Sequence, residues 1–126
     1  MSKMLAQGVL DRAQQYQARY TRARAVGVTS GTFEYTSGVQ TIVWGNISTG
    51  TTGSPPRDTA NFTLSTADPL EWGNIPEGVT IDKIWIYRQE DTDTPIAEYI
   101  LDEPKAFQLA GTLRVTTLPT IIDSGT

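Results

Sequence analysis

Residues 80–88 read Thr-Ile-Asp-Lys-Ile-Trp-Ile-Tyr-Arg, a run crowded with β-branched and aromatic side chains. Such side chains are enriched in β-strands, so this stretch is expected to form a central strand of the fold. Alternation along a strand places Ile84 and Ile86 on one face, and Ile81 on the other face with Lys83. Both faces carry apolar side chains, so both are expected to be at least partly covered.

The segment that follows supplies the expected hairpin partner. Residues 91–95 (Asp-Thr-Asp-Thr-Pro) have the composition of a turn, and residues 96–101 (Ile-Ala-Glu-Tyr-Ile-Leu) have that of a second strand. Two short apolar runs separated by turn residues are typical of a β-hairpin. No reactive group stands out in this hairpin, which indicates a scaffold and predicts no chemistry.

Composition narrows the classes of function. A chain of 126 residues fits one domain with an appendage. It contains no cysteine and no histidine. This excludes disulfides, cysteine nucleophiles and the side chain most used for acid–base catalysis and metal binding. Only carboxylates, Lys, Tyr, Ser and Thr remain to carry any catalysis, so composition favours a non-enzymatic protein, and neither a cofactor nor a metal is expected.

Hydropathy gives no sign of membrane insertion or export. No apolar run approaches the ~20 residues that a membrane-spanning helix requires. The first ten residues lack the basic start and apolar core of a signal peptide. The sequence therefore predicts a soluble protein that makes no contact with a membrane.

Charge is distributed unevenly along the chain. Residues 1–24 hold five basic residues and one acidic residue, a net charge of +4, whereas residues 25–126 hold five basic and thirteen acidic residues, a net charge of −8. A basic N-terminal segment on an acidic body is suited to docking on an acidic neighbouring molecule.

The N-terminal segment is predicted to be an amphipathic helix. From residue 2 to about residue 25 it contains no proline and one glycine, and its Ala, Gln, Arg and Leu favour helix. Its apolar residues recur with a mean spacing of 3.6 residues and share one stripe: Leu5, Val9, Ala13, Tyr16, Tyr20 and Ala23. A second stripe carries Arg12, Gln15, Arg19 and Arg22. Gly27 is expected to end the helix as a left-handed cap.

Beyond Gly27 the sequence changes to short alternating segments rich in Thr, Ser, Gly and Val. About seven strands are expected, which suits a mainly β fold with a single β-sandwich or jelly-roll-like domain. The expected organisation is an N-terminal helical arm, residues 1–26, and a β-sandwich domain, residues 27–126.

Three segments of this domain depart from the strand pattern. Residues 48–58 are interpreted as a flexible polar loop, and residues 68–78 as an irregular link between strands. Pro119 interrupts the last apolar stretch, so Ile121 and Ile122 are expected in an edge strand or a tail.

The helix is the best candidate for a binding surface. Its apolar stripe is thin, with two tyrosines and two alanines, and suits a partner surface or a body edge better than the middle of a core. The candidate partner-binding or oligomerisation residues are Leu5, Val9, Arg12, Ala13, Tyr16, Arg19, Tyr20 and Arg22. Arginines beside tyrosines also occur in nucleic-acid contacts. The acidic body opposes nucleic acid, so pairing of the arginines, including Arg24, with an acidic protein surface is favoured.

A second hypothesis is a carbohydrate- or host-surface-binding module. Aromatic faces stack on the apolar faces of sugar rings. Trp44 and Trp72, each before a glycine near a strand end, are candidate surface aromatics, together with Tyr35. Packing of the tryptophans in a core or an interface is the favoured alternative.

A third hypothesis is a hydrolase built on carboxylates, and the same acidic residues could also bind Ca²⁺. The sequence supports both only weakly. Asp91-x-Asp93 resembles the start of a calcium loop but lacks the downstream Gly and Glu, so a solvated turn is favoured over a metal site. Paired carboxylates would also be needed for a hydrolase. The residues concerned are Glu90, Asp91, Asp93, Asp102 and Glu103.

A family resemblance lies in the C-terminal half. Residues 81–88, a polar turn and residues 96–101 are followed by residues 107–115, which contain an Ala-Gly-Thr-Leu turn. This order resembles the end of small β-rich virion proteins of tailed bacteriophages, and the likeness covers residues 60–118. Thr112 stands where those proteins often have Asp, and the basic N-terminal helix differs from many of them.

The resemblance implies a minor head, collar or tail component without catalytic apparatus. The sequence therefore predicts a non-enzymatic structural protein of the virion, used in head decoration, the collar/neck or the tail and assembled in the host cytoplasm. Its helix is expected to anchor it to capsid, portal/neck or tail proteins, or to further copies in a homo-oligomer.

Overall fold

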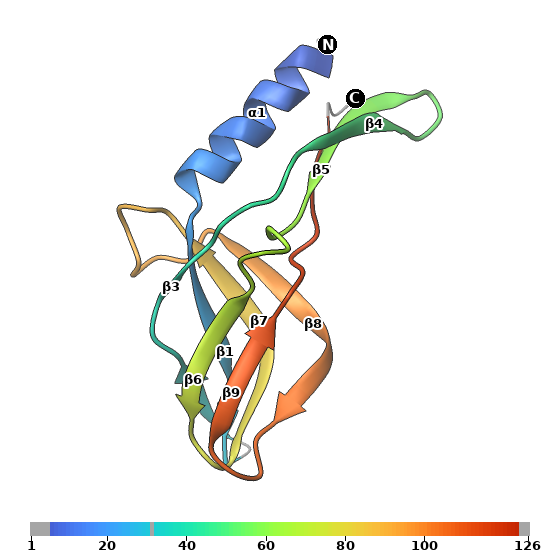
Figure 1. Ribbon diagram of the computed structural model, residues 1–126. Helices are drawn as coiled ribbons and strands as arrows, with labels where there is room; N and C mark the ends of the chain where they lie inside the picture. Colours follow the sequence, from blue (N-terminus) through green and yellow to red (C-terminus); the bar gives the residue numbers. More distant parts are fainter. Residues whose placement is uncertain (1–5, 31, 124–126) are drawn as a thin grey trace.

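The computed structural model describes residues 6–30 and 32–123. Within these residues the protein is mainly β, with ten strands in three antiparallel sheets, one helix near the N-terminus and no closed barrel (Figure 1). The first half contains α1 (Ala6–Arg19), β1 (Arg22–Thr29), β2 (Phe33–Thr36), β3 (Gln40–Thr41), β4 (Ser48–Thr52) and β5 (Arg57–Phe62). The second half contains β6 (Leu70–Ile75), β7 (Val79–Tyr87), β8 (Ala97–Ala106), β9 (Gly111–Val115) and β10 (Thr120–Asp123). The mainly β prediction is confirmed, although the strands are more numerous than the seven expected.

β7 is an interior strand of the largest sheet, as predicted. This five-stranded sheet has the order β2-β1-β7-β8, and β3 also pairs with β1. β8 runs antiparallel to β7, with Tyr99 opposite Ile84 and Ala97 opposite Ile86, so the predicted hairpin is confirmed. The other neighbour of β7 is β1, part of which the sequence pattern assigns to the helix.

A β-bulge in β7 corrects the predicted orientation of Ile81. Consecutive residues of β1 pair with Lys83 and Ile81, so Asp82 is an extra residue on β7. One inserted residue resets the alternation of side chains, and Ile81 turns to the same side as Ile84 and Ile86. All three isoleucines are buried in the main core.

The helix is shorter than the pattern predicts. α1 ends at Arg19 and β1 begins at Arg22, so the prediction of a helix to residue 25 is wrong. Gly27 lies inside β1 and caps nothing. From Arg22 onward arginine alternates with alanine, which also fits a strand, and pairing with β7 buries both alanines completely. Tertiary pairing here overrides helix propensity.

The main core lies between two sheets. β6 and β9 form a two-stranded sheet that lies over the five-stranded sheet in Figure 1. Trp72 of β6 and Leu113 of β9 belong to one buried cluster with Ile84 and Ile86 of β7. Full burial of one such aliphatic side chain contributes roughly 1.5–3 kcal/mol. Apolar burial therefore holds these two layers together.

β6 replaces the irregular link predicted for residues 68–78. Leu70 pairs with Val115 and Trp72 with Leu113 before the register shifts. Asn74 has a φ of 57°, a left-handed conformation that interrupts the strand pattern. This bulge explains why the sequence pattern hides the strand.

α1 packs on the third sheet, and the two form what we call the helical lobe: α1, β4, β5 and β10 (Figure 1). Val9 and Ala13 are fully buried against Ala60 and Phe62 of β5. The apolar stripe of the helix is thus covered by its own chain.

The β4–β5 hairpin replaces the predicted flexible loop at residues 48–58. β4 is exposed along its whole length but pairs with β5 from Ser48 to Thr52. The turn contains Gly53, with a φ of 84°, and a cis Ser54–Pro55 peptide bond. The edge-strand prediction for the end of the chain is confirmed, because β10 lies at one edge of this sheet.

Candidate functional site

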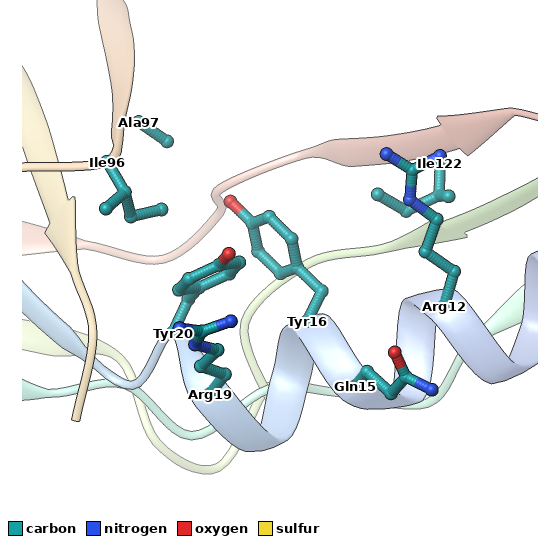
Figure 2. A pocket seen from close by; sticks show the side chains of 8 residues that line it. All are labelled: Arg12, Gln15, Tyr16, Arg19, Tyr20, Ile96, Ala97 and Ile122. Atoms are coloured by element: carbon teal, nitrogen blue, oxygen red, sulfur yellow. The ribbon is translucent and has the colours of Figure 1, made fainter. Parts of the chain in front are cut away.

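A cleft of about 380 Å³ opens where the helical lobe meets the five-stranded sheet. We call it the junction cleft. It is bounded by the C-terminal half of α1, the start of β8 and β10 (Figure 2). Its lining residues are Arg12, Gln15, Tyr16, Arg19, Tyr20, Ile96, Ala97 and Ile122. The structure thus brings together half of the binding residues that the sequence predicts.

An aromatic cluster fixes the floor of the junction cleft. The ring centroid of Tyr16 lies 4.5 Å from that of Tyr20, 5.6 Å from that of Phe62 and 5.9 Å from that of Trp44. The indole Nε1 of Trp44 donates a hydrogen bond of 2.9 Å to the carbonyl oxygen of Tyr20. Such aromatic pairs contribute about 0.5–1.5 kcal/mol each beyond area burial. The two tyrosines are therefore held in place by packing.

Four polar groups at the cleft make no hydrogen bond or ion pair with any residue that the structure describes. They are the Arg12 guanidinium, the Gln15 amide and the hydroxyls of Tyr16 and Tyr20. In Figure 2 the Tyr16 ring projects from α1, the Tyr20 ring lies beside it just after the helix, and Arg12 extends towards Ile122. These groups leave hydrogen-bond donors above an apolar floor.

The Tyr16 hydroxyl is protonated at neutral pH, because the ordinary pKa of tyrosine is about 10. Burial, and to a smaller extent the neighbouring Tyr20, raises the pKa of Tyr16 above its ordinary value. At neutral pH the hydroxyl is therefore a donor. With the positive charge of Arg12, the junction cleft favours a ligand that is negatively charged and accepts hydrogen bonds.

Arg19 is only weakly neutralised at the rim. Its Nε lies 3.9 Å from an oxygen of Glu90, and the two side chains are 56% and 63% exposed. Exposed ion pairs of this kind contribute ~0–1 kcal/mol. The Arg19 guanidinium carbon also lies 5.9 Å from the centroid of the Tyr20 ring. Arg19 therefore adds positive potential to the cleft.

The remaining predicted arm residues lie elsewhere. Val9 and Ala13 are fully buried against β5, so they cannot contact a partner while α1 occupies this position. Arg22 belongs to β1, where its Nη1 donates to the Thr41 hydroxyl at 2.6 Å. Leu5 lies outside the described residues.

Arg24 has a structural role. It donates to the carbonyl oxygens of Ser37 at 2.9 Å and Thr92 at 3.3 Å, and it lies 5.6 Å from the ring centroid of Tyr87. The arginines that the sequence pattern places on one helix are thus divided between α1 and β1. They form no single basic stripe of the kind that tracks a phosphate backbone.

The predicted surface aromatics are mostly engaged in packing. Trp72 is only 2% exposed, and its Nε1 donates to the carbonyl oxygen of Gly38 at 2.9 Å, so its assignment to the surface is wrong. Its size and apolar ring favour the core between β6 and the five-stranded sheet. Trp44 and Tyr35 are half-buried and pack against that core. They offer no shared open platform.

Asp91 stabilises a turn. Its Oδ1 accepts hydrogen bonds from the backbone N–H groups of Asp93 at 2.9 Å and Thr94 at 3.3 Å. The bond from Asp93 is the main cause that lowers the pKa of Asp91. Within residues 6–30 and 32–123, no three His, Cys, Asp or Glu side chains gather where they could hold a metal ion. In the same residues, no helix has the length and apolar character to cross a membrane.

An acidic bulge in β8 was not predicted. Lys105 pairs with Ile81, whereas Ile100 pairs with Lys83, so residues 101–104 stand opposite Asp82 alone. We call residues 101–104 (Leu-Asp-Glu-Pro) the acidic bulge. Pro104 is the one feature of the sequence that indicates this bulge, because proline has no N–H to donate to a neighbouring strand. The pairing that creates the bulge is not visible in the sequence.

Comparison with known proteins gives no relative for this chain. No family model, no curated protein and no solved structure matches it.

Proposed function

We propose that this protein is a non-enzymatic structural component of a bacteriophage particle, in head decoration, the collar/neck or the tail, and that α1 joins it to neighbouring virion proteins. One observation carries the proposal. α1 is held on its own sheet by Val9 and Ala13, while Arg12 and Gln15 remain without partners among the described residues. Arginine and tyrosine are enriched in protein interfaces. The likeness of residues 60–118 to small virion proteins supports the same conclusion.

Large apolar side chains at the surface add support. The exposed fractions are 70% for Phe33, 60% for Ile100, 77% for Leu109 and 66% for Ile121. Single exposed apolar residues are ordinary, so none of these residues defines an interface by itself. Their number suits a protein that is surrounded by neighbours in a particle.

The proposal includes a finer description of the fold as a β-sandwich of the jelly-roll-like kind. The two-stranded and five-stranded sheets share one core, in which Trp72 and Leu113 meet Ile84 and Ile86. Two antiparallel sheets packed face to face are the arrangement of a sandwich. A stiff two-layer body suits a virion part that does no chemistry.

Particle composition tests the proposed function. Gradient-purified particles of the phage that encodes this chain are analysed by quantitative mass spectrometry. The chain is expected in a fixed ratio to the major capsid protein, as the symmetry of the particle demands. A replication enzyme from the same infection is the control, and it should be lost during purification. Recovery of the chain only among free lysate proteins would contradict the proposal.

The positions of the two candidate tryptophans disfavour the carbohydrate-binding alternative. Trp72 is buried in the core, and the Trp44 ring makes T-shaped contacts with the rings of Tyr16 and Phe62. We therefore propose no second function.

A further inference from the structure

We infer that the junction cleft of one copy binds the acidic bulge of a second copy, so that copies of the chain associate head to tail. The inference rests on the proposed function, because it names the partner that α1 contacts. The residues that carry it are Arg12 and Tyr16 on one copy, and Ile100, Asp102 and Glu103 on the other.

The junction cleft has the chemistry of a carboxylate site. None of the eight described residues that line it is acidic, and Arg12, Tyr16 and Tyr20 all offer donors. Hydrogen bonds from a guanidinium or a phenol to an ionised carboxylate are stronger than bonds between neutral groups. Ile96 and Ile122 supply an apolar surface beside these donors. The cleft therefore fits a carboxylate that has an apolar side chain next to it.

The acidic bulge and the residue before it offer that combination. Asp102 and Glu103 are exposed, and they make no hydrogen bond or ion pair with any described residue. Ile100, which pairs with Lys83 just before the bulge, is 60% exposed. Residues 101–104 leave the β7 ladder, and Asp102 and Glu103 line an open hollow at the surface of the chain. Two exposed carboxylates thus follow an exposed apolar residue within four positions of an edge strand.

The contact must form between molecules. Ala97 lines the cleft and Leu101 starts the bulge, and both lie on β8. Four residues of extended strand span roughly 13 Å. Because β8 is paired to β7 between these points, the bulge cannot fold back into the cleft of its own chain.

A contact between two different surfaces repeats from copy to copy. Such a heterologous interface closes into a ring or continues as a filament. In a ring, several copies bind the neighbouring structure at once, so contacts that are individually weak give a stable attachment. Head-to-tail association would therefore give the proposed virion component its symmetry.

Charge reversal in the full-length protein tests the inference. Arg12→Glu should weaken self-association by about tenfold or more, because it places like charges together at the interface. The double change Asp102→Lys with Glu103→Lys should do the same. Native mass spectrometry and light scattering over a dilution series give the association constants. Circular dichroism verifies that each variant is folded, which is expected because these side chains are exposed.

Mixing distinguishes this contact from a general effect of charge. The two variant proteins should associate with each other, because the unchanged cleft of one meets the unchanged bulge of the other. Combining all three changes in one chain should also restore self-association. Gln14→Glu on α1 and Asp68→Lys on the body are controls that change charge in the same direction at exposed positions outside the cleft and the acidic bulge, and they should change little.

Two results would overturn the inference. One is a wild-type protein that stays monomeric at every concentration, and the other is unchanged association in both charge-reversed variants. Neither result bears on the proposed function, which particle composition tests separately.

Discussion

Gly27 lies in β1 at the bulge, close against the backbone of β7. A Cβ atom at this position would overlap the carbonyl oxygen of Thr80 and would lie 2.8 Å from the Cα of Ile81. These are backbone atoms of a paired strand and cannot rotate away. The glycine therefore allows the close approach of two strands at the bulge, a role in sheets that differs from capping a helix.

Gly27→Ala is expected to lower the free energy of unfolding by about 3 kcal/mol or more, since the added methyl group must displace the β7 backbone. Gly73→Ala is the matched control in β6, because a Cβ there meets nothing within 4 Å. Urea unfolding followed by tryptophan fluorescence measures both. Equal stabilities of the two variants would show that the strands are not packed as described.

The lowered pKa of Asp91 leads us to expect that the stability of the folded protein falls at acid pH. Backbone hydrogen bonds, chiefly from Asp93, lower its pKa in the folded protein. Its contribution to stability is therefore present above the pKa of the unfolded chain, and it is lost as the pH falls through the folded pKa. Asp91→Asn keeps an acceptor but removes this titration. Side-chain NMR should place the pKa of Asp91 below the ordinary value of an aspartate, and an ordinary value at Asp91 would contradict the turn geometry.

At the scale of elements, α1 is held by a small apolar contact. Val9 and Ala13 are fully buried, and they meet only a limited set of residues on β5 and around it. Val9→Ala should cost on the order of 2 kcal/mol, because it removes buried methyl groups and leaves a cavity. Gln14→Ala, on the exposed side of α1, should stay within about 0.5 kcal/mol of wild type. Chemical unfolding compares the two, and an unaffected Val9→Ala variant would mean that α1 does not pack on β5.

The bulge in β7 leads us to expect that Asp82 can be deleted without loss of the fold. Without Asp82 the sequence from Ile81 to Ile86 alternates regularly, with the isoleucines on one side. Deletion of Asp82 should therefore leave a folded protein, because it removes an inserted residue and preserves the core face. Deletion of Trp85 is the control, since it turns either Ile81 or Ile86 away from the core. Circular dichroism and thermal unfolding should show cooperative folding for the first deletion and its loss for the second.

The sequence predicts elements well where local pattern and tertiary packing agree. The central strand at β7, the hairpin with β8 and the edge position of β10 all follow from alternation and turn residues. The α1 stripe is also predicted up to Tyr16. The pattern fails where a partner strand decides the structure, as at the start of β1, or where an inserted residue changes the alternation, as at Asp82 and Asn74.

The candidate site is less predictable than the fold. The helix pattern supplies Arg12, Tyr16, Arg19 and Tyr20, but it cannot supply Ile96 and Ile122, which come from distant strands. The pattern also leaves open whether Val9 and Ala13 face a partner or an edge of the body, and the structure shows their own sheet covering them. No local signal distinguishes these two outcomes.

In the whole molecule, the helical arm is directly connected to the largest sheet. β1 begins three residues after α1 ends and then pairs along β7, so the helical lobe is continuous with the body. Removal of residues 1–25 would delete the start of an interior strand together with the helix. Single substitutions on the exposed side of α1 are therefore the proper test of its role.

The most direct test is a cryo-electron microscopy reconstruction of the particle at side-chain resolution. We predict that each copy keeps Val9 and Ala13 against β5, and that a neighbouring molecule covers its junction cleft at Arg12 and Tyr16. A particle in which the cleft is open to solvent in every copy would contradict this account. So would a helix that has left β5 and binds its neighbour through its apolar stripe.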